Sequence, residues 1–186
     1  EFSDQPSSIA KLDQFANLVV LRTLSKSHAA AGLRCGAAVA RGDVTSLLQK
    51  VLAPYPLAAP VMQAALTILK PENTAKLAEK RADIVMRRNG YAKEFAKLDD
   101  VQSVLPSDAN YLLVLVRDAA DLYEKARKSG IILRDQSHQP GLENAVRIAI
   151  GSAEEMQQLL AVMTGKNPPA LPAQRRFSVT RKTNET

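Results

Sequence analysis

The 186-residue chain has no tryptophan, one cysteine, two histidines and eight glycines, and each scarcity excludes something. A single cysteine, Cys35, cannot form an internal disulfide, which fits a reducing compartment. Two separated histidines and one cysteine offer no spacing typical of metal ligands, so we expect no metal site. The glycines form neither a dinucleotide-binding fingerprint nor a phosphate-binding P-loop.

Long apolar runs are also absent. The chain contains no stretch of about eighteen apolar residues and does not start with a basic segment followed by an apolar one. We therefore expect neither a membrane span nor a secretory signal. With 46% hydrophobic residues the chain can still bury a core, and we interpret it as a soluble, cytoplasmic protein.

The net charge of +6 comes mainly from one end of the chain. Residues 166–186 carry five basic side chains and one acidic one, whereas acids and bases interleave in the helix-like segment 76–97. Few aromatic side chains are available for nucleic-acid bases to stack on. We therefore expect no nucleic-acid binding, and we expect the proline-rich, basic tail at 166–186 to be flexible.

The order of strand-like and helix-like segments predicts an α/β fold, because strands alternate with helices after residue 71. Ser7 can cap a short helix, and Ser152 with Glu155 forms the signature of a capping box. The predicted helices span 7–15, 43–52, 59–69, 71–98 and 118–130, with a last one opened by Ser152, and the predicted strands span 18–21, 33–40, 101–105, 111–116, 131–133 and 146–150.

One lysine has surroundings that suit covalent binding of a cofactor. Lys26 lies in a hydroxyl-rich loop after the apolar run 18–21, and Arg34 follows eight residues later in what looks like a buried strand. A lysine held and desolvated at a strand end can form a Schiff base with a phosphate-bearing aldehyde cofactor. Arg34 offers a planar fork to the phosphate, and the Thr23 and Ser25 hydroxyls can add neutral hydrogen bonds. The alternatives are a solvated lysine, a surface arginine in an ion pair, and ordinary turn hydroxyls.

The wider sequence pattern resembles that of a known protein family. Thr-Leu-Ser-Lys at 23–26, followed by Ala-Gly-Leu-Arg-Cys-Gly at 31–36, resembles the cofactor-lysine motif of the fold-type I pyridoxal-phosphate (PLP) aminotransferases. Four further motifs occur in the order and spacing of the histidinol-phosphate aminotransferase branch: Ala-Pro-Tyr-Pro-Leu at 53–57, Asn-Tyr at 110–111, Gly-Ile-Ile-Leu-Arg-Asp at 130–135 and Val-Arg-Ile-Ala-Ile-Gly at 146–151. The resemblance covers residues 1–165.

The resemblance implies a cofactor, a substrate and the residues that bind them. It implies pyridoxal 5'-phosphate bound covalently to Lys26, with Ser25, Thr23 and Arg34 as further cofactor-binding residues. Arg134 and Arg147 would grip a substrate phosphate, and Asn110 and Tyr55 are further substrate-site candidates. Structural ion pairing remains an alternative for the two arginines, a turn cap for Asn110, and packing or a subunit interface for Tyr55.

The implied reaction exchanges an amino group between L-histidinol phosphate and 2-oxoglutarate in histidine biosynthesis, in a homodimer acting on small molecules. Related PLP enzymes act on aromatic amino acids or on threonine phosphate, which keeps those substrates open. The other alternative, from a different class, is a catalytically silent α/β module.

The resemblance also indicates a missing part. Members of this family are about twice as long, and their cofactor site uses an aspartate and a tyrosine on the strand just before the position matching Glu1. We therefore expect this chain to be a carboxy-terminal half that is inactive alone. We expect residues 1–57 to end the large PLP-binding domain, 58–165 to form the small carboxy-terminal α/β domain, and 166–186 to form the tail.

Overall fold

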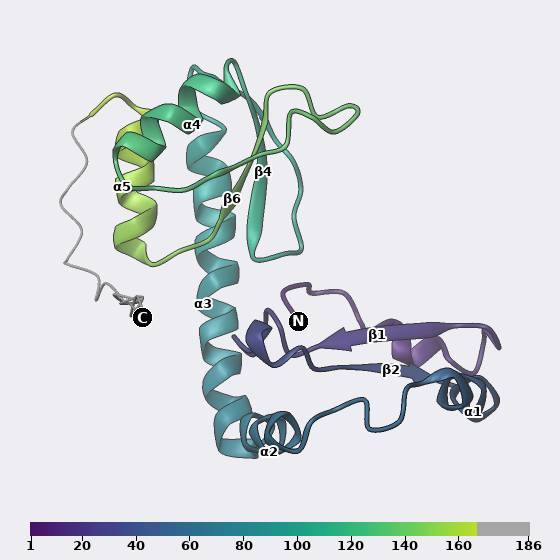
Figure 1. Cartoon of the computed structure of the whole chain (residues 1–186). Helices are drawn as coiled ribbons and strands as arrows, with labels where there is room; N and C mark the ends of the chain where they lie inside the picture. The colour runs from purple at the N-terminus through teal and green to yellow at the C-terminus, as the bar shows by residue number, and fades with distance from the viewer. Residues whose placement is uncertain (167–186) are drawn as a thin grey trace, which may run out of the picture. The chain divides into compact units, whose positions relative to one another are not determined.

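The computed structural model of the chain describes residues 1–166 and separates into two compact units. The first unit holds Glu1–Ala92 and Leu105–Leu112, and the second holds Lys93–Val104 and the described residues from Leu113 on. The elements in chain order (Figure 1) are η1 (Ser8–Lys11), β1 (Val19–Thr23), η2 (Ala31–Leu33), β2 (Gly36–Ala40), α1 (Gly42–Val51), α2 (Ala59–Ile68), α3 (Pro71–Phe95), β3 (Val101–Val104), β4 (Tyr111–Val116), α4 (Ala119–Lys128), β5 (Arg134–Asp135), β6 (Ala145–Ala149) and α5 (Ala153–Met163).

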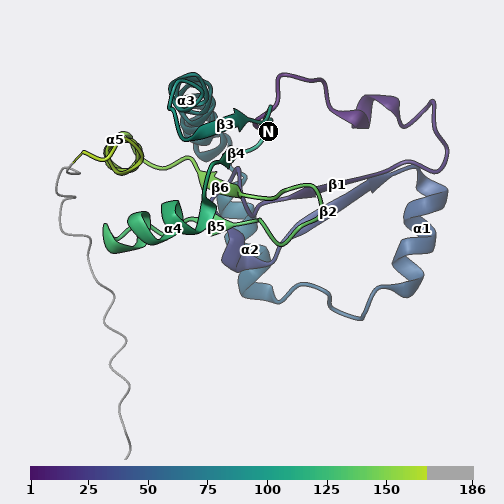
Figure 2. The same cartoon turned by 90° about the horizontal axis from the view of Figure 1, so that it is seen from above.

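An antiparallel strand pair organises the first unit. β1 pairs with β2 in a register that runs from Val19 opposite Ala40 to Thr23 opposite Gly36. The two strands lie side by side, and α1 follows β2 at one end of the pair (Figure 2). We expected a buried strand at 18–21, and this is wrong for the described residues, in which Leu21 is 74% exposed. The physical reason is that β1 belongs to a sheet of two strands, which leaves its faces largely open.

Helix α3 begins in the first unit and ends in the second. Its first residue is Pro71, which suits a helix start because the missing N–H would have no partner inside the helix there. Its last residue, Phe95, is fully buried. The helix therefore ends three residues before the predicted Leu98, at an aromatic side chain that packs into the core.

The second unit is built on a four-stranded sheet of order β3-β4-β6-β5. Along β4 the side chains alternate between half-buried and buried, as one covered sheet face requires. Helices α4 and α5 contact one another and lie beside the sheet (Figure 2). The largest fully buried side chains are Phe95, Leu112, Val114, Val146, Ile148 and Met156.

The α/β class expected from the sequence is confirmed, and the predicted strand at 111–116 coincides with β4. The predicted strand at 131–133 is wrong, because pairing starts only at Arg134. The predicted helix at 7–15 shortens to the 3-10 turn η1, which the Ser7 side chain caps. The basic tail predicted at 166–186 lies outside the described residues apart from Lys166, and the domain boundary expected after residue 57 stays a prediction.

Within residues 1–166, no helix combines the length and the apolar character that crossing a membrane requires.

The capping box at the start of α5 provides a test of this packing. The Ser152 Oγ accepts the Glu155 N–H at 3.2 Å, and the Ser152 N–H donates to the Glu155 Oε2 at 2.8 Å. Replacing Ser152 by alanine should lower the free energy of unfolding by about 1 kcal/mol, because a helix N–H loses its partner. Urea denaturation checks this, with Gln157→Ala at an exposed position of α5 as the control. An equal loss in both variants would contradict the cap.

Candidate functional site

The lysine loop, residues 24–30, is closed by main-chain hydrogen bonds immediately after β1. The Leu24 N–H donates to the Cys35 carbonyl at 3.1 Å, and the Ala30 N–H donates to the Leu24 carbonyl at 3.1 Å. A third bond, 3.1 Å from the Ala29 N–H to the Lys26 carbonyl, folds the loop around the lysine. The loop is therefore an ordered turn that displays Lys26.

Lys26 itself is exposed in the described residues. The desolvation that we expected for this amine is not provided by its own loop, because the loop packs against the unit through Ser27 and Ala30 instead. The two predicted hydroxyl residues, Thr23 and Ser25, both precede the lysine in the chain. The Thr23 Oγ1 accepts the Ser25 N–H at 3.2 Å, so the hydroxyl of Thr23 braces the first turn of the loop.

Arg34 adopts a conformation that the sequence did not predict. We placed it in a buried strand, but it is exposed, with a left-handed backbone at φ 51° between η2 and β2. The strand begins two residues later because η2 and this left-handed residue turn the chain first. The Arg34 Nη1 donates to the Ala31 carbonyl at 3.0 Å. Left-handed non-glycine residues gather at functional sites, where the surrounding structure holds them.

Ser27 and His28 form a pair that sequence reasoning missed. Ser27 is 5% exposed, and its Oγ lies 2.8 Å from the His28 Nδ1. Burial and then the charge of Arg81 lower the pKa of His28 below its usual value, against an opposite effect of Glu1. The sequence signal that could have indicated this pair was a serine on each side of Lys26, namely Ser25 and Ser27. The contact gives His28 a polar packing role within the loop.

A cavity of about 340 Å³ adjoins the loop and is lined by residues that include Thr23, His28 and Cys35. At its edge the Glu1 carboxylate pairs with Arg22, whose Nε donates to Oε1 at 3.0 Å. Burial raises the pKa of Glu1, but the hydrogen bond and charge of Arg22 outweigh it, so the pKa lies below its usual value. The cavity wall thus carries charges that largely neutralise one another.

The two other predicted arginines face each other in the second unit. Arg134 on β5 and Arg147 on β6 are register partners in an antiparallel pair. Arg134 is exposed, whereas Arg147 is half-buried between the buried Val146 and Ile148. Cross-strand partners project on the same face of a sheet, and like charges directly opposite one another destabilise the pair. The register therefore places both guanidinium groups on one face of the sheet.

Asn110 and Tyr55 both belong to the first unit. Asn110 is half-buried in the turn before β4, where the Ser107 Oγ accepts the Ala109 N–H at 3.1 Å and donates to the Tyr111 carbonyl at 2.6 Å. Tyr55 is 94% exposed and has a left-handed backbone. The packing alternative for Tyr55 is therefore wrong within the described residues.

The structure thus brings the predicted residues together in two sets. Thr23, Ser25, Lys26 and Arg34 flank one loop of the first unit, and Arg134 pairs with Arg147 in the second. A lysine amine, two hydroxyls and a guanidinium around one turn are the donor set that a phosphate-bearing aldehyde requires. In and beside the lysine loop, these four residues therefore match such a group in their chemistry.

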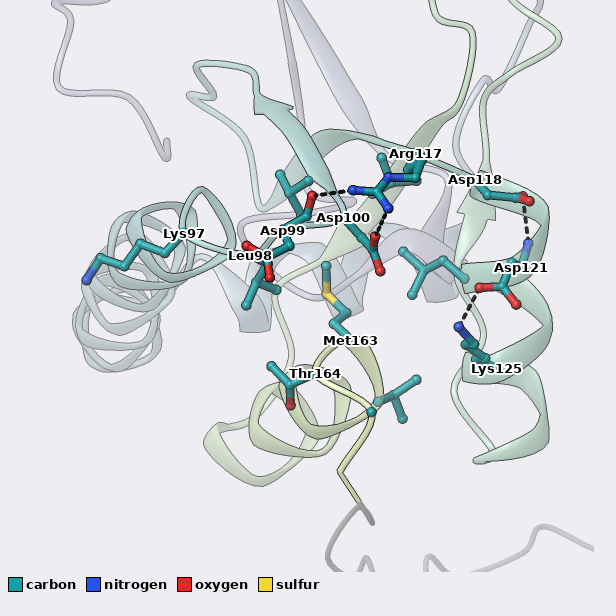
Figure 3. A pocket seen from close by; sticks show the side chains of 15 residues that line it. Lys97, Leu98, Asp99, Asp100, Arg117, Asp118, Asp121, Lys125, Met163 and Thr164 are labelled. Carbon is teal, nitrogen blue, oxygen red and sulfur yellow. Dashed lines mark hydrogen bonds and ion pairs between the residues drawn. The ribbon is translucent and has the colours of Figure 1, made fainter.

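A larger cavity, of about 500 Å³, lies in the second unit (Figure 3). Its charged side chains mostly pair with one another: Arg117 Nη1 lies 3.3 Å from Asp100 Oδ1, and Lys125 Nζ lies 2.5 Å from Asp121 Oδ2. The predicted site residues are not among those that line it.

Across residues 1–166, no group of three or more histidine, cysteine, aspartate or glutamate side chains is placed to hold a metal ion.

Known proteins resemble this chain over most of its described part. The family model for aminotransferase class I and II matches residues 1–163. Histidinol-phosphate aminotransferase 2 of Mannheimia succiniciproducens is 37% identical over 163 residues, which are 88% of this chain and 47% of that protein. The histidinol-phosphate aminotransferase of Yersinia pseudotuberculosis is 39% identical over 163 residues, which are 88% of this chain and 43% of that protein.

A solved structure has the same fold. The crystal structure of histidinol-phosphate aminotransferase from Sinorhizobium meliloti in complex with pyridoxal-5'-phosphate superposes with a TM-score of 0.72 at 22% identity. The match covers 84% of this chain and 43% of that one. The chain therefore spans less than half the length of the relatives it resembles here.

The lowered pKa of His28, caused by burial and the charge of Arg81, predicts a pH dependence of stability. Because the pKa of His28 is lowered in the folded state, the unfolded chain binds the proton more readily. The stability that the neutral ring contributes is present above the unfolded pKa, about 6.5, and is lost as the pH falls through that value toward the folded pKa. Urea denaturation between neutral and mildly acidic pH should show this loss, and His28→Gln should remove that part of the slope.

The control is His138→Gln, which removes the only other imidazole from an exposed position. It should keep the pH dependence of the unfolding free energy. A slope that survives His28→Gln unchanged would contradict the assignment.

Proposed function

The chain belongs to the class I and II aminotransferase family, and from this premise we propose that it is the carboxy-terminal part of a pyridoxal-phosphate-dependent aminotransferase. The activity proposed for the whole protein is that of a histidinol-phosphate aminotransferase, which exchanges an amino group between L-histidinol phosphate and 2-oxoglutarate. The observation that carries the proposal is the closed loop displaying Lys26 between two hydroxyl residues and Arg34. The names of the relatives at 37% and 39% identity support the choice of substrate.

In this proposal residues in and beside the lysine loop bind the cofactor. Pyridoxal phosphate, when bound, supplies an electron sink for the substrate α-carbon. The Lys26 amine holds the cofactor covalently, and once released it moves a proton to and from that α-carbon. Thr23, Ser25 and Arg34 bind the phosphate, with Arg34 contributing charge and a planar fork.

The second set of residues would bind the substrate. Arg134 and Arg147 stand opposite one another on β5 and β6, and a phosphate between two guanidinium groups relieves their mutual repulsion. Gripping a substrate at its phosphate orients the bond to be broken at the α-carbon, which is a large part of catalysis by positioning. Asn110 is proposed to contact the substrate as well.

Further parts of the proposal concern the whole protein. We propose a homodimer in the cytoplasm that acts on small molecules, and the 94% exposed Tyr55 is a candidate for the substrate site or the subunit interface. Residues 1–57 are proposed to end the large cofactor-binding domain and residues 58–165 to form the small α/β domain. The five motifs in register support this division.

A second candidate function is a silent α/β module that folds without turning over substrate. The exposure of Lys26 favours it for this chain taken alone, because a solvated amine is a poor nucleophile. The two proposals are compatible, since the parent protein can be an enzyme while this part of it is inactive.

Absorbance spectroscopy tests the cofactor proposal. In the gene product that contains this chain, added pyridoxal phosphate should produce the visible band of lysine-bound cofactor, and Lys26→Ala should abolish it, because the covalent link is lost. The 186-residue chain alone should show a weak band or none. Lys50→Ala, exposed in the last turn of α1, is the control that should keep the band. A band that survives Lys26→Ala would sink the assignment of this lysine.

Steady-state kinetics tests the substrate proposal. Replacing Arg147 by methionine in the same gene product should lower kcat/KM for L-histidinol phosphate by about 10- to 100-fold, as expected for losing a charged hydrogen bond. The value for phenylalanine, which has no phosphate, should change little. Lys128→Met, exposed on α4, is the charge-matched control. A parent protein that prefers phenylalanine to histidinol phosphate would require another substrate.

A further inference from the structure

A buried arginine outside the predicted site joins three segments of the first unit. Arg88 on α3 is 4% exposed. Its Nη1 donates to the Phe2 carbonyl at 3.1 Å and to the Ala109 carbonyl at 3.0 Å, and its Nε donates to the Asn89 Oδ1 at 3.1 Å. Burying a guanidinium is costly unless its donors are satisfied. Within residues 1–166 these donors are satisfied by main-chain carbonyls and a side-chain amide. The guanidinium therefore holds main-chain segments in place.

One of these contacts fixes the segment that carries Asn110. The Ala109 carbonyl belongs to the peptide group that joins Ala109 to Asn110, and Arg88 holds it. The Ser107 Oγ accepts the Ala109 N–H at 3.1 Å, so both peptide groups of Ala109 are held. Because the backbone on the amino-terminal side of Asn110 is fixed, the starting point of its side chain is fixed too.

The other contact leads to the lysine loop. Phe2 is buried, and its neighbour Glu1 pairs with Arg22, whose Nε donates to the Glu1 carboxylate at 3.0 Å. Arg22 lies on β1 directly before Thr23. A continuous series of contacts therefore runs from Arg88 through the chain segment at Phe2 to the strand that ends at the lysine loop.

We propose that Arg88 is a positioning residue: its guanidinium holds the Asn110 segment and the lysine strand in one fixed arrangement, so that Asn110 and Lys26 act on the same substrate. The role rests on the proposed function, which assigns Lys26 to the cofactor and Asn110 to the substrate. Lysine cannot replace arginine here, because an ammonium keeps the charge but lacks the planar fork that reaches two carbonyls and an amide.

Hydrogen exchange tests the positioning without using activity. In the gene product that contains this chain, free of cofactor, Arg88→Lys should speed amide exchange about tenfold in residues 105–112 and in the lysine loop, as the loss of one hydrogen bond predicts. Arg87→Lys is the matched control. Arg87 is the neighbour of Arg88 on α3 and donates to Asp83, so this variant should leave both segments unchanged. Exchange that stays at the wild-type rate in residues 105–112 would overturn the proposal.

A double-mutant cycle separates positioning from simple loss of stability. If Arg88 acts through Asn110, the loss of kcat/KM caused by Arg88→Lys should be several-fold smaller in an Asn110→Ala background. A purely structural role gives losses that multiply independently, and that result would also overturn the proposal. A wild-type protein that shows no transamination contradicts the proposed function, and the exchange experiment then decides the positioning of the two segments by itself.

A second variant covers the case in which Arg88→Lys does not fold. Asn89→Ala keeps the guanidinium and both carbonyl contacts but removes the acceptor of the Arg88 Nε. It should raise exchange in the same two segments by a smaller factor. Exchange raised evenly over the whole first unit would contradict a specific role.

Discussion

The close approach of β1 and β2 at their ends is the constraint on which the lysine loop depends. Thr23 stands opposite Gly36, and a Cβ on that glycine would lie 2.7 Å from the Arg22 carbonyl. Main-chain atoms cannot yield as a flexible side chain can, so only glycine lets the strands pair so near their ends. Pairing there brings the Leu24 N–H to the Cys35 carbonyl, and the loop between them is then short enough to close on itself. The loop that displays Lys26 is thus placed by a residue that has no side chain.

In the second unit, strand pairing likewise determines where two side chains lie. Two residues of β5 are enough to set Arg134 opposite Arg147, because antiparallel register determines which side chains share a face. The buried Val146 and Ile148 fix the strand that carries Arg147. The register thereby places the two arginines on the same face of the sheet.

The sequence predicted the elements that periodicity and capping determine, and it failed where the backbone departs from them. β4 and the capping box of α5 follow from alternation and from a Ser-to-Glu spacing, and both are present as expected. The prediction that Arg34 lies in a buried strand was wrong, because a 3-10 turn and a left-handed residue interrupt an apolar run that looks like continuous strand. Lys26 was expected to be desolvated, which depends on atoms beyond its loop. No local pattern carries that information.

Arg88 shows what a closer look at periodicity would have found. It follows Ile84 by four residues and precedes Ala92 by four, so it stands on the apolar stripe of α3. A charge on such a stripe indicates either an error in the predicted face or a buried partner. The partners here are carbonyls that come from distant parts of the chain, and a single sequence does not reveal main-chain acceptors of this kind.

The left-handed backbone of Arg34 sets the stability of the folded chain against the phosphate-binding role proposed for this side chain. Glycine adopts this conformation without steric cost, so Arg34→Gly relieves strain of about 1 kcal/mol in the folded chain while making the unfolded chain more flexible. It also removes the guanidinium. Selection for thermal stability alone would favour small or amide side chains at position 34. Selection for the proposed phosphate binding would favour arginine. The residue types found at position 34 in variants of the protein would therefore show which of the two selections acts on it.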